Sequence, residues 1–133
     1  MIPLRDTVPS RRIPWMTRGF LVLNLAAFVL ELGQGPSLES FVSRFGVVPS
    51  SWHLTTPSDL LDWPGLLLTL LTSQFLHGGL LHLASNMLYL WIFGDNVEDR
   101  LGHGRFVWLY LGSGVAAAVT QLLMTPASSL PMV

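Results

Sequence analysis

The chain has 133 residues, of which 50% are hydrophobic and only 11% are charged, with a formal net charge of −1 and a mean hydropathy of +0.52. Soluble domains carry about 25% charged residues, so this composition favours a protein embedded in a membrane. All seven cations are arginines, and no basic block exists beyond Arg11-Arg12, which argues against nucleic acid as a partner. The absence of cysteine excludes a disulfide framework, a thiolate zinc site and a cysteine nucleophile.

Residues 1–18 are polar, contain four arginines, and are expected to form a cytoplasmic N-terminal tail. Residues 19–33 form the first apolar run, which is short for a membrane span. A cleavable signal peptide has a similar basic start and short apolar core, but no convincing small-x-small cleavage pattern follows Leu30. We therefore expect a retained membrane helix over residues 19–33.

Residues 34–77 are expected to form a long amphipathic first loop. Glycine and proline recur along it, yet its apolar residues are too numerous for a free linker. We expect short helical pieces in the headgroup region, as amphipathic segments form there. The stretch from Leu66 to Leu76 is expected to dip toward a pocket.

Two further spans are expected over residues 78–93 and 105–124, separated by a polar turn over residues 94–104. The chain thus has room for three membrane helices of about 20 residues each. The last span has a small-residue face, on which pairs such as Gly112/Ala116 and Gly114/Ala118 favour close helix approach. The sequence therefore predicts an all-α, polytopic membrane helix bundle.

The arginines predict the orientation of these spans. Four lie in the N-terminal tail and two, Arg100 and Arg105, lie in or beside the polar turn, whereas the long first loop has only Arg44. Cytoplasmic loops carry an excess of positive charge. The N-terminus and the turn should therefore be cytoplasmic, and the first loop and the C-terminus should lie outside.

Three polar residues stand out at the start of the second span: His77, His82 and Asn86. Polar groups are rare within membrane segments and face a bundle interior or a water-filled cavity. His82 and Asn86 are four residues apart, so they share one helix face. They could form a polar pocket with chemistry, or merely hold the bundle together by interhelical hydrogen bonds.

A metal site is the rival chemistry for these three residues. Zinc favours three or four His, Cys or carboxylate ligands, and an amide oxygen is a poor third ligand. His53 or Asp62 from the first loop could complete such a site. We nevertheless expect no metal and no other cofactor.

The segment from Thr72 to Asn86, followed by Gly94-xxx-Glu98-xxx-Gly102, resembles the rhomboid intramembrane serine proteases. The pattern is a histidine, a second histidine five residues on, an asparagine four further on, and then the Gly-Glu-Gly spacing. The resemblance covers about residues 17–133. It implies that residues 19–133 are a partial rhomboid-like membrane domain, with three of the six helices of the family's core. The complete core cleaves transmembrane substrates with a Ser–His dyad and needs no cofactor.

The resemblance also implies roles for individual residues. His82 and Asn86 would be oxyanion-side donors, which stabilise the negative charge on the scissile carbonyl oxygen. His77 would be a structural histidine that bonds the first loop to the helix. Glu98, with Gly94 and Gly102, would form a packing and hydrogen-bonding motif at the cytoplasmic end of the second helix.

Some features depart from the family pattern or lie outside it. The family's Gly-x-Ser-Gly would begin about where the sequence reaches Leu130–Val133, and the base histidine would lie later still. Ser113, in Leu111-Gly-Ser-Gly114, is superficially similar but lies in mid-span, in the wrong order relative to the histidines. His53 and His103 are expected to be loop residues without a special role.

The sequence is thus interpreted as the N-terminal part of an intramembrane serine endopeptidase that cuts near the outer face of a bacterial-type plasma membrane. It would be inactive alone, and its partners would be membrane lipid, a transmembrane protein substrate and the missing C-terminal half of the same fold. The alternative is a non-catalytic rhomboid-like module that binds transmembrane helices. A third interpretation is a truncated gene product that misfolds because its small-residue face lacks a partner helix.

Overall fold

The computed structural model describes residues 13–52 and 59–132 of the chain. These residues form five α-helices and three short 3-10 turns: α1 (Trp15–Gly33), η1 (Gly35–Ser37), α2 (Leu38–Phe45), η2 (Pro49–Ser51), α3 (Asp59–Thr72), η3 (Ser73–Phe75), α4 (Leu80–Leu101) and α5 (His103–Met124). Within this part of the chain the only β-pairing is an isolated bridge between Val47 and Met132. The prediction of an all-α fold is confirmed.

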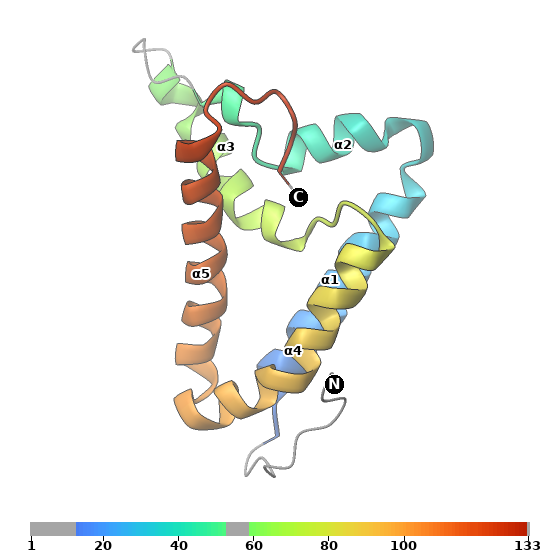
Figure 1. Cartoon of the computed structure of the whole chain (residues 1–133), viewed down its shortest axis with the longest axis vertical. Helices are drawn as coiled ribbons and strands as arrows, with labels where there is room; N and C mark the ends of the chain where they lie inside the picture. Colours follow the sequence, from blue (N-terminus) through green and yellow to red (C-terminus); the bar gives the residue numbers. More distant parts are fainter. Residues whose placement is uncertain (1–12, 53–58, 133) are drawn as a thin grey trace.

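The helices form an open bundle in which α1 and α4 lie side by side (Figure 1). Helix α5 joins α4 beside the start of α1 and then diverges from both. At the other end of the molecule, α3 and η3 fill the space between α5 and α1, and α2 lies across the end of α1. The segment before α4 is therefore held among three helices.

Two of the described helices, α1 and α5, are long and apolar enough to cross a membrane. A third candidate is a bent pair, in which Leu67–Phe75 meets α4 at an angle of 88°. Together they form an all-α membrane helix bundle. Helices α1, α4 and α5 overlap the residues of the spans expected over 19–33, 78–93 and 105–124, although α4 passes as a candidate span only together with Leu67–Phe75.

The helix ends differ from the expected spans in two places. Helix α1 begins at Trp15, inside the expected tail, and α4 continues to Leu101, so most of the expected polar turn over 94–104 is helical. The polar residues there do not break the helix because Gly94 and Glu98 are buried against α1. The actual turn is a single residue, Gly102, whose φ of +80° suits glycine.

The segment expected as a long first loop is largely helical as well. It contains α2, and its 14-residue helix α3 precedes η3. The apolar run from Leu67 to Leu71 continues α3 toward the bundle interior, where Leu70 and Leu76 are buried. This segment therefore packs as part of the fold.

The inward face of α1 organises the core. Its buried residues recur with helical spacing: Thr17, Phe20, Asn24, Phe28 and Glu31. The Phe20 ring stacks on Tyr110 of α5 at 4.0 Å between centroids. The opposite face of α1 exposes large apolar side chains, as expected for a helix that faces lipid.

Candidate functional site

The site begins at the sharp bend between η3 and α4, where His77 is followed by Gly78-Gly79. Gly79 has a φ of +152°, which an L side chain would rarely tolerate. This backbone lets the chain turn into α4 immediately after His77. The His77 side chain is buried and the His82 side chain, on the first turn of α4, is exposed.

The two imidazole rings of His77 and His82 lie close together in an edge-on arrangement. Their centroids are 5.3 Å apart and their planes meet at 65°. Nδ1 of His77 lies 3.1 Å from the carbonyl oxygen of Phe75. Because a carbonyl oxygen only accepts, this contact requires the proton on Nδ1.

The backbone of His77 is bound by α1. Its N–H lies 3.1 Å from Oε1 and 3.3 Å from Oε2 of Glu31, so the carboxylate accepts from it. The Phe28 ring, one turn earlier on α1, meets the His77 ring edge-on at 6.4 Å. The last two turns of α1 therefore contact His77, which lies just before the start of α4.

Asn86 lies one turn after His82, and both side chains line a cavity of about 680 Å³. Gln74 of η3 and Tyr110 of α5 line it from the other sides. Asn86 also borders a second cavity of about 370 Å³, together with His77. The structure thus brings His77, His82 and Asn86 to one place, on the walls of adjoining cavities.

Ser113 also lines the larger cavity, from mid-helix in α5. Its hydroxyl donates to the carbonyl oxygen of Tyr110 at 2.9 Å, on its own helix. The glycine that follows has a packing reason: a Cβ at Gly114 would lie 2.2 Å from Oε1 of Gln74. The Gly-Ser-Gly run is therefore part of a regular helix on which Gln74 rests.

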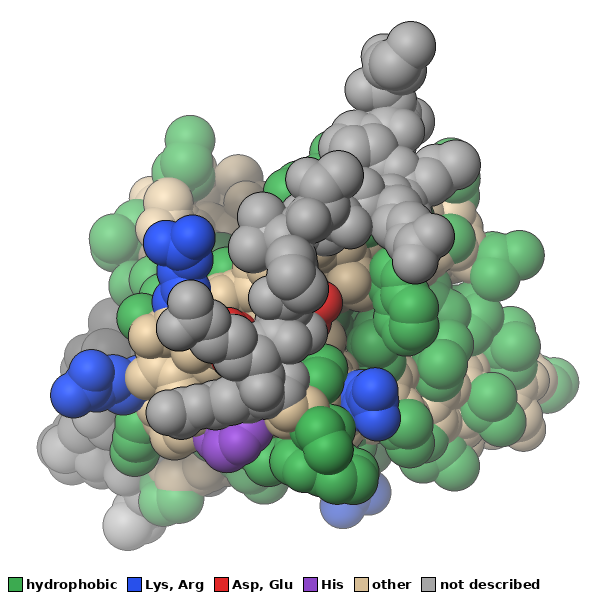
Figure 2. Space-filling view, turned by 90° about the horizontal axis from the view of Figure 1, so that it is seen from below, with side chains coloured by type: hydrophobic (Ala, Val, Ile, Leu, Met, Phe, Trp, Pro, Cys, Tyr) green, Lys and Arg blue, Asp and Glu red, His purple; other side chains and the backbone are tan. Residues whose placement is uncertain are grey.

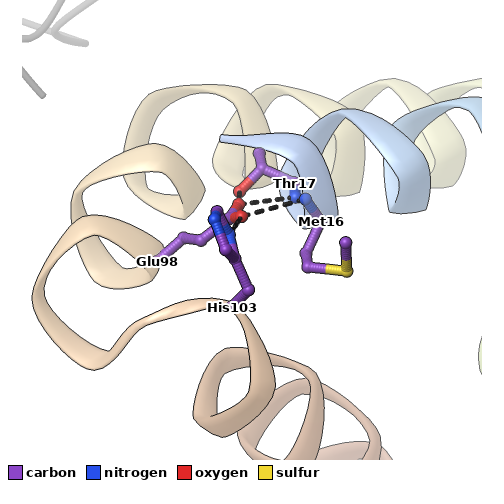
Figure 3. A network of polar contacts seen from close by, with 4 residues as sticks. All are labelled: Met16, Thr17, Glu98 and His103. Carbon is purple, nitrogen blue, oxygen red and sulfur yellow. Dashed lines mark hydrogen bonds and ion pairs between the residues drawn. The ribbon is translucent and has the colours of Figure 1, made fainter. Parts of the chain in front are cut away.

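The second group of predicted site residues lies at the opposite end of α4 (Figure 3). The Glu98 carboxylate, 1% exposed, accepts from the backbone N–H groups of Met16 at 2.9 Å and Thr17 at 2.8 Å. It also accepts from the Thr17 hydroxyl at 2.7 Å and contacts Nδ1 of His103. One carboxylate therefore joins α1, α4 and the start of α5.

The glycines around Glu98 have separate tasks. A Cβ at Gly94 would lie 2.7 Å from Cγ2 of Thr17, so glycine permits the close approach of α1 to α4. Gly102 forms the turn into α5. Gly94, Glu98 and Gly102 thus lie together at the junction of three helices, far along α4 from His82 and Asn86.

One expectation is corrected at this junction. His103 was expected to be a loop residue without a special role, but it is the first residue of α5 and bonds Glu98. The single-residue turn at Gly102 brings its ring back onto α4. His53, and the side chain of Asp62, lie outside the described residues.

Sequence reasoning missed three residues of α1 that support these sites: Thr17, Asn24 and Glu31. Asn24 donates to the Phe20 carbonyl oxygen at 2.6 Å and to the Tyr110 hydroxyl at 3.1 Å. The signal was present, because the three polar residues recur every seven positions in an apolar helix and so share one face. Among the described residues, no group of three or more His, Cys, Asp or Glu side chains could hold a metal ion.

The comparisons with known proteins agree with the motif. The family model of the Rhomboid domain matches residues 64–133. The rhomboid protease GluP of Bacillus subtilis is 33% identical over 114 residues, which cover 85% of this chain and 21% of that protein. RHOMBOID-like protein 4 of Arabidopsis thaliana is 31% identical over 135 residues, which cover 83% of this chain and 33% of that protein.

A mitochondrial relative is similar too. The human presenilin-associated rhomboid-like protein, mitochondrial, is 33% identical over 98 residues, which cover 73% of this chain and 22% of that protein. The chain thus spans between about a fifth and a third of the length of these relatives. No solved structure matches it significantly. The match of the Rhomboid domain over more than half of its residues shows that this chain belongs to the rhomboid family.

Proposed function

We propose that this chain is the N-terminal part of an intramembrane serine endopeptidase that cleaves transmembrane substrates near the outer membrane face. The observation that carries the proposal is the placement of His82 and Asn86. They lie one turn apart on α4, and both line the cavity of about 680 Å³. Polar side chains on a membrane helix are rare and costly, and they face a bundle interior or a water-filled cavity, which supports a chemical use for this pair.

The proposed use is stabilisation of an oxyanion. When a peptide bond is attacked, negative charge develops on the carbonyl oxygen, and N–H donors aimed at that oxygen lower the barrier. The Asn86 amide offers two N–H groups, and His82 offers a ring N–H. Each such donor is worth about 2.7–4 kcal/mol of transition-state stabilisation.

The nucleophile and its base are proposed to come from the rest of the fold. Acyl transfer needs a serine beside a general base, and the Ser113 hydroxyl is instead bonded to its own helix. The relatives are three to five times longer than the region that they share with this chain. The 133 residues alone would then retain only the weak catalysis of oxyanion donors and binding.

The charges support a proposed orientation. Arg18, Arg100 and Arg105 are exposed and belong to the start of α1 and to the α4–α5 junction. Figure 2, which views the molecule from this end, shows basic side chains spread around it. By the positive-inside rule this end faces the cytoplasm. The His82/Asn86 site then lies toward the outer face of a bacterial-type inner membrane, in contact with lipid and transmembrane substrate.

A second candidate is a non-catalytic module that binds transmembrane helices. The observation that favours it is the exposure of α5. Only 6% of the apolar stretch of this helix is buried within the described fold. Such a face can take lipid, the rest of the same fold or another membrane helix. The module would hold a helix without cleaving it.

Complementation tests the proposal. The chain is co-expressed with the C-terminal remainder of GluP from Bacillus subtilis, and cleavage of a generic transmembrane substrate is measured. Restored cleavage is expected, and His82→Ala and Asn86→Ala should each lower kcat by about 10²–10³-fold. Ser85→Ala is the matched control, because Ser85 lies between them on α4 and its hydroxyl donates to the His82 carbonyl oxygen at 2.9 Å.

Two outcomes would contradict the proposal. One is no cleavage although both parts are stably inserted, which favours the binding module. The other is cleavage that survives both alanine substitutions, which removes His82 and Asn86 from the chemistry. Ser113→Ala should leave cleavage unchanged, because the nucleophile is proposed to come from the rest of the fold.

A further inference from the structure

A carboxylate at the end of α1 has no part in the proposed chemistry. Glu31 is 3% exposed, although α1 is apolar over most of its length. Burying an ionisable group in such a helix costs free energy unless a partner compensates it. The contacts of Glu31 therefore show which group compensates its buried carboxylate.

Those contacts lead to the bend before α4. Both carboxylate oxygens lie within 3.3 Å of the N–H of His77. The chain turns by 88° between Leu67–Phe75 and α4, so helical hydrogen bonding is interrupted at this point. A buried N–H without a partner is costly, and Glu31 supplies the acceptor that the broken helix lacks.

The side chain of His77 is held as firmly as its backbone. The Phe28 ring packs edge-on against it from α1, and the Phe75 carbonyl oxygen accepts from Nδ1. The His82 ring meets the His77 ring in an edge-on arrangement, with 5.3 Å between the ring centroids. The His82 side chain is exposed, and the His77 ring packs against it.

We propose that Glu31 is a positioning residue for the His82/Asn86 site; this inference rests on the proposed function. Glu31 fixes the turn at His77, the His77 ring sets the orientation of His82, and the start of α4 is thereby held at the cavity. The end of α1 thus acts on the site through His77 and touches no reacting atom.

The test that needs no cleavage is NMR spectroscopy of the whole 133-residue chain in detergent micelles, with ¹⁵N-labelled histidine. Glu31→Leu should shift the His77 amide signal, accelerate its exchange with solvent about tenfold, and shift the imidazole signals of His77 and His82. Glu31→Gln keeps an acceptor oxygen at the same reach and should stay close to the wild type.

Thr17→Val is the matched control, since it removes a buried hydroxyl from the other end of the same helix face. It should leave the signals of His77 and His82 unchanged. Glu31→Asp, whose carboxylate is one methylene short, is the second variant if Glu31→Leu fails to fold. Its His77 amide should shift in the same direction as in Glu31→Leu.

The second readout is cleavage by the complemented enzyme. Glu31→Leu should lower kcat while KM stays the same, and Glu31→Gln should restore kcat. Unchanged His77 and His82 signals in both Glu31→Leu and Glu31→Asp would overturn the inference. So would a wild-type kcat in a folded Glu31→Leu variant, provided that His82→Ala is inactive in the same assay. If no complemented chain cleaves, the proposed function fails, and the histidine signals alone decide the role of Glu31.

Discussion

At the scale of single residues, three polar side chains on one face of α1 join it to the rest of the bundle. Thr17 bonds Glu98 of α4, Asn24 bonds Tyr110 of α5, and Glu31 bonds the turn at His77. Such bonds are individually modest in membranes, about 0.6 kcal/mol on average. At three levels along one helix they specify its rotation and its register.

The Thr17–Glu98 contact belongs to a cap that Glu98 provides for α1. Pro14 precedes the helix and offers no side-chain cap, so the N–H groups of Met16 and Thr17 depend on a carboxylate from another helix. A negative charge at a helix N-terminus is also favoured by the helix dipole. Glu98 therefore replaces the local cap that the sequence of α1 lacks.

We predict that Glu98→Leu destabilises the fold. Each donor that loses its acceptor and stays buried costs about 1–3 kcal/mol, so the free energy of unfolding should fall by at least that amount. Glu98→Gln keeps one acceptor oxygen and should lose less. The measurement is unfolding of the chain in mild detergent, by heat or by added denaturing detergent.

The control is Glu39→Gln, which neutralises an exposed carboxylate on α2. Its melting temperature should equal that of the wild type. If the melting temperature of Glu98→Leu equalled that of Glu39→Gln, the cap would contribute nothing to stability.

At the scale of elements, α4 connects the two groups of predicted site residues. His82 and Glu98 are 16 positions apart, which separates them by about 24 Å along the helix. The start of α4 carries the polar wall of the cavity, and its end packs tightly on α1. A change at Gly94 therefore tests the packing of the bundle apart from the chemistry of the site.

Gly94→Ala is predicted to push α1 away from α4. The new methyl group would lie 2.7 Å from the Thr17 side chain, and overpacking of this kind costs about 1–3 kcal/mol. Gly112→Ala is the matched control, because a Cβ there meets no described atom within 4 Å. The melting temperature should fall for Gly94→Ala and stay the same or rise for Gly112→Ala.

The small-residue face of α5 makes fewer close helix contacts within the described fold than its sequence predicts. The sequence predicted close helix approach at Gly112/Ala116 and Gly114/Ala118. Within the described fold, Gly114 admits the side chain of Gln74 and Gly112 faces open space. If Gly112→Ala destabilised the protein more than Gly94→Ala, the tight helix contact would lie at α5 instead of α4.

At the scale of the whole molecule, the two ends of the bundle differ. One end gathers the start of α1, the α4–α5 junction and the exposed Arg18, Arg100 and Arg105, and the other holds α2, α3 and the start of α4 (Figure 1). The helices between them expose large apolar side chains, which suit a lipid environment. This asymmetry underlies the proposed orientation.

Reporter fusions test that orientation. A fluorescent protein at the N-terminus should fold in the cytoplasm and fluoresce, and alkaline phosphatase fused after Val133 should be active outside. Replacing Arg18, Arg100 and Arg105 by Gln should reduce this asymmetry, because positive charges favour the cytoplasmic side of a membrane. If the alkaline phosphatase fused to the unmodified chain were inactive because it lies in the cytoplasm, the proposed orientation would be reversed.

Much of the architecture could be read from local sequence, because helix formation and membrane insertion depend on apolar runs and on spacing. The composition indicated a membrane protein, the apolar runs indicated α1, α4 and α5, and the motif around His82 and Asn86 indicated the family. These properties belong to segments of about 20 residues, and each segment carries its own signal.

Only the tertiary structure decided which distant groups meet. The contacts Glu31–His77, Asn24–Tyr110 and Thr17–Glu98 join residues 46 to 86 positions apart. The role of His103 depended on a turn of one glycine, and the helical extension of α4 depended on burial against α1. A sequence pattern shows which face of a helix a polar side chain occupies, but its partner is set by the packing of whole helices, which no single segment encodes.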